Sequence, residues 1–178
     1  MFVAAHLGLA PWDVFHQGVS RHIGISLGLV IEIVGILLLL FWIPLRQRPG
    51  VGTILNAVEV GLVVNLIGEH LPSTDRLIPR LAYVIGAVVV IAVGSGLYIG
   101  AGLGTGPRDG IMVGLAARGF SLRVTRTVLE AVVMAIGIAL GGHIGIGTLA
   151  FVVGIGPLIH ILIPKLALRP VVVLEPVT

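Results

Sequence analysis

The sequence predicts an all-α protein whose helices cross a lipid bilayer several times. Of its 178 residues, 57% are hydrophobic and only 11% are charged, whereas soluble domains carry about 25% charged residues. A chain so poor in charge cannot cover its own surface with groups that suit water, and the bilayer removes this difficulty. Five long apolar segments and an internal duplication indicate one membrane domain over residues 1–178.

Each of the five apolar segments is close to the roughly 20 residues that a helix needs to span about 30 Å of hydrocarbon. The stretches between them are rich in Gly, Pro and Asp, as turns are. We expect spans over residues 23–45, 53–71, 80–101, 122–141 and 147–163. Two further stretches, 11–21 and 107–118, are too short to span. We expect each to form a short helix, either re-entrant or interfacial.

The chain repeats itself in two places. AHLGLAPWD at 5–13 resembles AGLGTGPRD at 101–109, and PGVGTILNAVEVG at 49–61 resembles HIGIGTLAFVVGIG at 143–156. This divides the chain into repeat one, 1–72, repeat two, 77–166, and a cytoplasmic tail, 167–178. A full span precedes the first block of repeat two, but only residues 1–4 precede that of repeat one. We therefore expect the first span of repeat one to be missing, by truncation or naturally. A unit of three spans plus one short helix predicts two inverted repeats, as in many secondary transporters.

Charge distinguishes the two sides of the predicted bundle. The positive-inside rule makes the more basic side cytoplasmic, with the C-terminus on it and the protein in the plasma membrane. The basic residues on that side are Arg46, Arg48, Arg108, Arg118, Arg123, Lys165 and Arg169, with Arg126 nearby, against Arg21, Arg76 and Arg80 opposite. Trp12, Trp42, Tyr83 and Tyr98 fall near the interfaces, as an aromatic belt would, and we expect His16 to be solvated there. No basic run with interleaved aromatics occurs, so we expect no nucleic-acid partner.

The ionisable residues inside the spans are the most informative. Glu32, Glu59 and Glu130 lie in three different spans, and a charge at bilayer depth costs at least about 2.5 to 3.5 kcal/mol. We therefore expect them to face the bundle interior, with Arg126 pairing with Glu130 one turn away. The same predicted site contains three more polar residues: Asn56, Asn65 and His160. Either this is a structural network that fixes helix packing, or it is a path for a solute or proton.

Each predicted short helix begins with proline followed two residues later by aspartate. The residues of this signature are Pro11, Asp13, Pro107, Arg108 and Asp109. Proline suits the first helical position, and an acid in the first turn meets the positive end of the helix dipole. One interpretation is that each block only starts a helix. The other is that the two aspartates line the mouths of a site, and the two interpretations are compatible.

Three strings of the sequence resemble a known family: GLAPWDVFHQGVSRHIGISLG, GLYIGAGLGTGPRDGIMVGLAARGFSLRVTRTVLE and GIGTLAFVVGIGPLIH. The chain is similar along nearly its whole length to the YczE/YitT-type family of bacterial integral membrane proteins, and to its YczE branch especially. The resemblance implies a multi-pass protein of the plasma membrane. Members of that family usually carry one more helix at the N-terminus, and the family has no settled biochemical activity to carry over.

The inverted duplication and the intramembrane carboxylates together favour a transporter or permease for a small solute or proton. The alternative is a scaffold or accessory protein without transport activity, which packs against a partner membrane protein or a second copy of the chain. We expect no enzyme activity, cofactor or metal site, because the chain has no cysteine and no His-x-x-x-His. The lipid bilayer is the partner in every interpretation.

Overall fold

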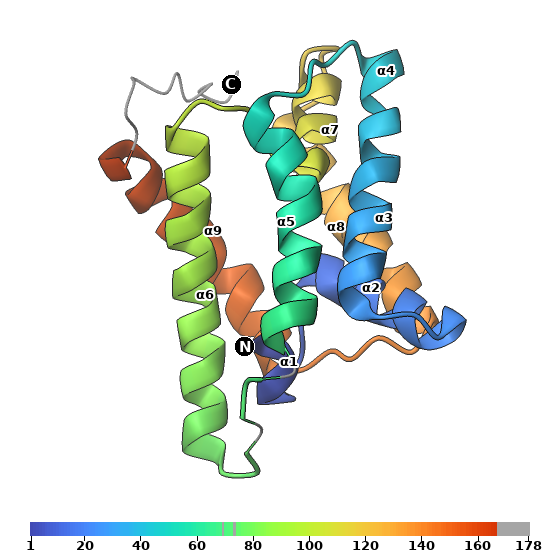
Figure 1. Cartoon of the computed structure of the whole chain (residues 1–178). Helices are drawn as coiled ribbons and strands as arrows, with labels where there is room; N and C mark the ends of the chain where they lie inside the picture. The colour runs from blue at the N-terminus through green and yellow to red at the C-terminus, as the bar shows by residue number, and fades with distance from the viewer. Residues whose placement is uncertain (69, 73, 167–178) are drawn as a thin grey trace.

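A computed structural model of the chain describes residues 1–68, 70–72 and 74–166. Every regular element within these residues is a helix, which confirms the all-α prediction (Figure 1). The helices are α1 (Phe2–Ala5), α2 (Pro11–Ile23), α3 (Leu27–Leu40), α4 (Trp42–Leu45), α5 (Val51–Gly68), α6 (Leu77–Gly100), α7 (Pro107–Ala116), α8 (Leu122–Ala139) and α9 (Ile146–Leu166). The expected cytoplasmic tail, 167–178, lies outside the described residues.

Within the described residues, four helices are long and apolar enough to cross a membrane. They are α3 and α4 taken together (Leu27–Leu45), α5, α6 over Leu77–Tyr98, and α9. Five were expected. The segment 122–141 does form a helix, α8, but Arg123, Arg126 and Glu130 make it too charged to count with the other four. The two shorter stretches form α2 and α7, each beginning at the predicted proline.

The helices pack most extensively in three pairs: α6 with α9, α2 with α8, and α3 with α5. The short helices lie at opposite ends of the bundle, α2 near the lower end and α7 near the upper end in Figure 1. Glycines set the closest approaches. A Cβ on Gly28 of α3 would overlap the backbone of Gly61 in α5, and a Cβ on Gly18 of α2 would overlap that of Gly137 in α8. Small residues at such crossings let helices pack closely in membranes.

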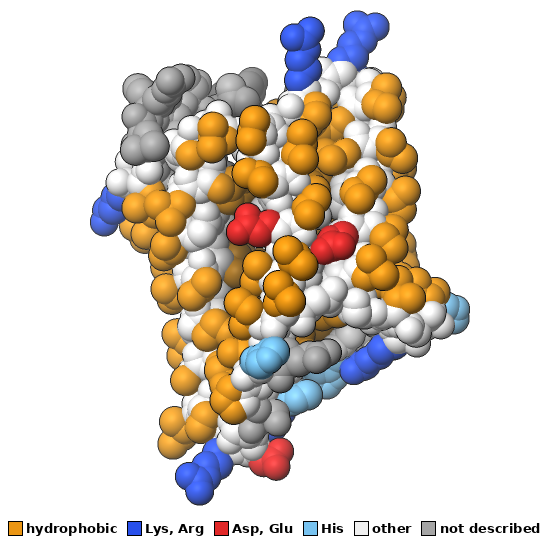
Figure 2. Space-filling view, in the orientation of Figure 1, with side chains coloured by type: hydrophobic (Ala, Val, Ile, Leu, Met, Phe, Trp, Pro, Cys, Tyr) orange, Lys and Arg blue, Asp and Glu red, His pale blue; other side chains and the backbone are white. Residues whose placement is uncertain are grey.

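The buried apolar core lies where α1, the start of α2, α6 and α9 meet. Phe2 packs edge-on against Phe151, with ring centroids 5.9 Å apart, and Val14 and Ala92 belong to the same cluster. Elsewhere the long helices expose large hydrophobic side chains. Figure 2 shows them over the flank of the bundle, between two ends at which Lys and Arg gather. This is the surface expected of a protein whose flank is solvated by lipid.

Two loops of similar form cross the starts of two spans. The backbone N–H of Gly52, at the start of α5, donates to the carbonyl oxygen of Leu103 over 3.0 Å. That of Gly147, at the start of α9, donates to the carbonyl oxygen of Leu7 over 2.6 Å. In each loop the next residue is a glycine at positive φ, a conformation that glycine adopts without strain. Gly104, after Leu103, has a φ of 116°, and Gly8, after Leu7, has a φ of 106°. The loop before α2 is thereby attached to α9, and the loop before α7 to α5.

Candidate functional site

A cavity of about 390 Å³ lies between the starts of the two short helices. Residues of α3, α5 and α6 form most of the remaining wall, and α9 contributes one phenylalanine. Much of the lining is apolar and a few polar side chains converge on it, which is the usual composition of a small-molecule site. The polar and aromatic side chains of the lining are Trp12, Asp13, His16, Asn56, Ser95, Tyr98, Arg108, Asp109 and Phe151.

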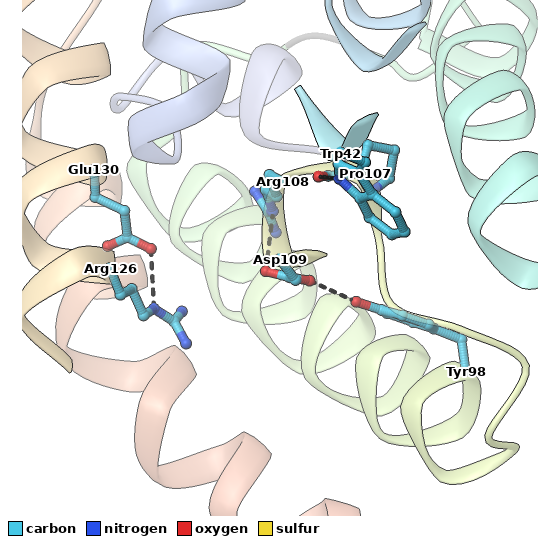
Figure 3. Close-up of polar contacts among 7 residues, drawn as sticks. All are labelled: Trp42, Tyr98, Pro107, Arg108, Asp109, Arg126 and Glu130. Carbon is cyan, nitrogen blue, oxygen red and sulfur yellow. Dashed lines mark hydrogen bonds and ion pairs between the residues drawn. The ribbon is translucent and has the colours of Figure 1, made fainter. Parts of the chain in front are cut away.

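At the α7 end of the cavity, both carboxylate oxygens of Asp109 have a partner (Figure 3). The Tyr98 hydroxyl on α6 donates to Asp109 Oδ2 over 2.8 Å, and Arg108 Nε lies 3.9 Å from Oδ1. Trp42 holds the start of α7, because its indole N–H donates to the carbonyl oxygen of Pro107 over 2.9 Å. This end therefore presents a carboxylate that is already hydrogen-bonded and close to a guanidinium.

The α2 end of the cavity is less completely paired. His16 Nδ1 lies 3.6 Å from Asp13 Oδ1, which is too long for a hydrogen bond. Trp12 and His16 are buried, with exposed fractions of 5% and 7%. Among the described residues, neither Trp12 Nε1 nor His16 Nδ1 has a hydrogen-bond partner. Two buried polar atoms at this end are therefore unsatisfied, a state that native proteins usually avoid.

Each short helix contributes its first turn to the cavity wall. Both helices begin with proline, and neither has a side-chain cap. The positive end of each helix dipole is therefore at the cavity, and the aspartate in the same turn offsets it. Paired half-helix ends of this kind form solute sites in several transporter folds.

Several residues of the predicted short-helix signature meet in this cavity. They come from two stretches far apart in the sequence, and one polar residue of α5 joins them. The predicted residues that line the cavity are Asp13, Asn56, Pro107, Arg108 and Asp109, and Pro11 is buried at the start of α2 beside them.

The three glutamates do not come together, which corrects the expectation of a shared interior site. Glu32 is half-buried against Gly61 at the crossing of α3 and α5, and Glu59 is exposed on α5. Figure 2 shows acidic side chains over α3 and α5 in the middle of the apolar flank. The reason is the packing of α5, which among the described helices lies mainly against α3, so the side that bears Glu59 stays uncovered.

The remaining predicted residues lie outside the cavity lining. Arg126 Nε and Glu130 Oε1 form the expected pair, 3.1 Å apart on α8 (Figure 3). Asn65 and His160, expected deep in the bundle, are both exposed. Asn65 nevertheless has a structural role, because its Oδ1 accepts a hydrogen bond of 3.0 Å from the backbone N–H of Gly28 near the start of α3.

Sequence reasoning missed five of the polar and aromatic residues of the cavity: Trp12, His16, Ser95, Tyr98 and Phe151. Trp12 and Trp42 were expected in an aromatic belt at the membrane interfaces, but both are buried inside the bundle. His16 was expected to be solvated and is also buried. One signal was available for two of them, because Trp12 lies inside the Pro-x-Asp block and His16 lies one turn after its aspartate. No local sequence pattern predicts the hydrogen bond from the Tyr98 hydroxyl to Asp109 of α7.

Comparisons with known proteins decide the family. Residues 1–164 match the family of unknown function DUF6198. The chain belongs to this family. An uncharacterized protein of Haemophilus influenzae is 32% identical over 171 residues, which are 96% of this chain and 78% of that protein. The uncharacterized membrane protein YczE of Bacillus subtilis is 30% identical over 161 residues, which cover 89% of this chain and 75% of the length of YczE. The uncharacterized protein YyaS of Bacillus subtilis is 27% identical over 169 residues, 91% of this chain and 83% of its own.

Membership of the DUF6198 family confirms the resemblance to YczE-type proteins. Together with the four apolar helices, the likeness to YczE makes this chain a membrane protein that contacts the lipid bilayer. No solved structure matches the chain significantly.

Proposed function

We propose that this DUF6198-family chain is a transporter or permease for a small solute, not an enzyme, and that the cavity is its solute site. The observation that carries the proposal is the cavity of about 390 Å³, which the first turns of two short helices from opposite ends of the bundle both line. A transporter must expose one site to the two sides of the membrane in turn. A site lined by one short helix from each end suits that requirement.

We further propose that residues 1–72 and 77–166 are inverted repeats. The sequence blocks that precede α2 and α7 are similar, and these helices lie at opposite ends of the bundle. The bond from Gly52 to Leu103 also has a counterpart in the bond from Gly147 to Leu7. In transporters built this way, one repeat rocks against the other around a central site.

The proposed orientation places the α7 end in the cytoplasm, with the protein in the plasma membrane and the C-terminus on the cytoplasmic side. Arg46 and Arg118 support it, because both belong to the connections at this end, where Arg118 Nη1 donates to the carbonyl oxygen of Leu45 over 3.0 Å. Basic residues near short loops favour the cytoplasmic side.

Flux into liposomes that contain the full chain tests the transport proposal. Asp109→Asn and Tyr98→Phe are expected to lower uptake of the transported solute by about tenfold, because each removes part of a polar contact worth about 1.5 kcal/mol or more. The matched control is Tyr83→Phe, whose hydroxyl donates to the carbonyl oxygen of Pro72 at an exposed place. A panel of small labelled solutes that shows no uptake above empty liposomes would contradict the proposal, as would equal uptake by the two tyrosine variants.

A second candidate function, that of a scaffold or accessory protein, is favoured by Glu59. Its carboxylate is exposed on the apolar flank, where a partner helix that donates a hydrogen bond would stabilise it. Under this function, Glu59→Leu abolishes a complex with another membrane protein isolated in mild detergent, and the cavity variants leave that complex intact. Under the transport proposal, Glu59→Gln leaves uptake unchanged.

A further inference from the structure

The two aspartates of the cavity differ in how far they are paired. Asp109 accepts a hydrogen bond from Tyr98 and lies close to Arg108. Among the Lys, Arg and His side chains that the structure describes, only His16 has a nitrogen within 4 Å of the Asp13 carboxylate, at 3.6 Å. The α2 end therefore holds a carboxylate that is available to a ligand.

The buried polar atoms around Asp13 also lack partners. Trp12 Nε1 is a donor, and His16 Nδ1 is an acceptor when the proton is on Nε2. Both residues are more than nine-tenths buried and line the cavity. A buried polar group without a partner costs about 1–3 kcal/mol, and a ligand that completes these bonds recovers that cost.

The positions of these atoms specify the chemistry of the ligand. Asp13 Oδ1 and His16 Nδ1 are acceptors 3.6 Å apart, close enough for one ammonium group to donate to both. The neighbouring Trp12 indole N–H calls for an oxygen acceptor, and its ring can contact a cation through its face. A ligand that satisfies all three residues carries an ammonium group and an oxygen.

We propose that the cavity binds a small amino alcohol or related amine, with its ammonium group between Asp13 and His16 and its oxygen at the Trp12 indole N–H. As a solute class the assignment rests on the proposed transport function, whereas binding itself requires no transport. The net charge of the cavity lining also favours a cationic ligand, because the lining contains two carboxylates and one guanidinium when His16 is neutral.

A neighbouring amine of the chain itself responds to the same carboxylate. Burial lowers the pKa of the Met1 α-amino group, and the negative charge of Asp13 opposes that shift. At Met1 burial outweighs the charge of Asp13, which acts in the direction that favours a protonated amine. An anion would instead face Asp13 directly, and its attraction to Arg108 would be reduced because Arg108 lies near Asp109.

The test is a binding titration of the purified full chain in detergent, with binding measured by ligand-observed NMR. Ethanolamine is the smallest probe with both groups. Ethylamine lacks the oxygen, ethylene glycol lacks the amine, and glycolate replaces the cation with an anion. Ethanolamine is expected to bind most tightly, ethylamine several-fold more weakly, and the other two without saturation. Tighter binding of glycolate than of ethanolamine, or no binding of ethanolamine, would overturn the proposal.

Four variants separate the contacts. Asp13→Asn is expected to weaken ethanolamine at least about tenfold, since it removes the charge. Trp12→Phe is expected to lower the affinity for ethanolamine to that for ethylamine and to leave the affinity for ethylamine unchanged. Glu59→Gln, outside the cavity, is the control and leaves every affinity as in the wild type. Asp13→Glu keeps the charge and retains measurable binding, so that a misfolded Asp13→Asn does not decide the result.

The binding proposal and the transport proposal can be refuted independently of each other. Uptake of other solutes without amine binding would refute the assigned ligand class and leave the transport proposal standing. Amine binding that depends on Asp13, without flux of any solute, would refute transport and leave the binding site standing.

Discussion

Trp42 fixes the start of α7 through one hydrogen bond and one close contact. Its indole N–H donates to the carbonyl oxygen of Pro107, and its ring occupies the space into which a side chain on Gly110 would project. Trp42 is only 3% exposed, so the ring has little room to move away. A single residue therefore sets the position of the helix end that carries Arg108 and Asp109.

Gly110→Ala is expected to destabilise the protein by about 1–3 kcal/mol, because the added methyl group overlaps the Trp42 ring in a packed interior. Thermal unfolding in detergent, followed by tryptophan fluorescence, measures the change. Gly156→Ala on α9 is the matched control, since no described atom of another element lies within 4 Å of its Cβ position. Equal unfolding midpoints for the two variants would show that Trp42 does not restrict this position.

At the scale of elements, the α3–α5 pair shows how two apolar helices approach closely. Gly28 and Gly61 each leave room for the backbone of the other helix, and Glu32 lies over the same crossing. Asn65 adds one hydrogen bond to the backbone of Gly28. Since lipid tails solvate apolar surface as well as a helix does, such packing and hydrogen bonds are the main attraction between these helices.

Gly61→Leu is expected to separate α5 from α3, because the side chain would overlap the backbone of Gly28. Size-exclusion chromatography in mild detergent should then show loss of the monodisperse folded species. At Gly68, at the end of the same helix, an added Cβ has no described atom of another element within 4 Å, so Gly68→Leu should elute as the wild type does. Indistinguishable elution of both variants would contradict the close crossing.

Local signals predicted the helices well, because each is encoded within a short stretch of chain. Proline at the first position and aspartate two residues later marked the starts of α2 and α7, and both signatures were correct. The signal was weaker for α8, where an apolar segment also carries Arg123, Arg126 and Glu130. A long apolar stretch indicates a helix, but its charges decide whether it resembles the other spans.

The candidate site was predicted only in part, since it depends on contacts between distant segments. Asp13 and Asp109 were identified because each marks a helix start. Burial of His16 depends on packing around α2, which no local pattern reveals. The outward position of Glu59 was unpredictable for a related reason: α5 is apolar on every side, so helical periodicity does not indicate which side faces the bundle.

At the scale of the whole molecule, charge and hydrophobicity divide the surface into three zones. The flank is apolar, and Lys and Arg gather at both ends (Figure 2). Arg48 lies in the connection between α4 and α5, and Arg76 in the connection between α5 and α6. Because α5 is long and apolar enough to cross the bilayer, these two connections are expected on opposite sides of it.

The absence of cysteine from the sequence makes this topology directly measurable. In intact cells, Arg76→Cys is expected to react with a membrane-impermeant maleimide. Arg48→Cys is expected to react only after permeabilisation, because its side carries more basic residues. Reaction of both single-cysteine variants from the same side would rule out a crossing by α5, and the reverse pattern would invert the proposed orientation.

The bonds that attach Leu7 to Gly147 and Leu103 to Gly52 bear on how the protein is made. The ribosome adds Gly52 long before Leu103, and Leu7 long before its partner Gly147. Neither half is therefore complete on its own while the chain is being inserted. Partly synthesised chains would expose unpaired backbone amides and open helix crossings for longer, and such intermediates are the ones that proteases and chaperones remove or protect.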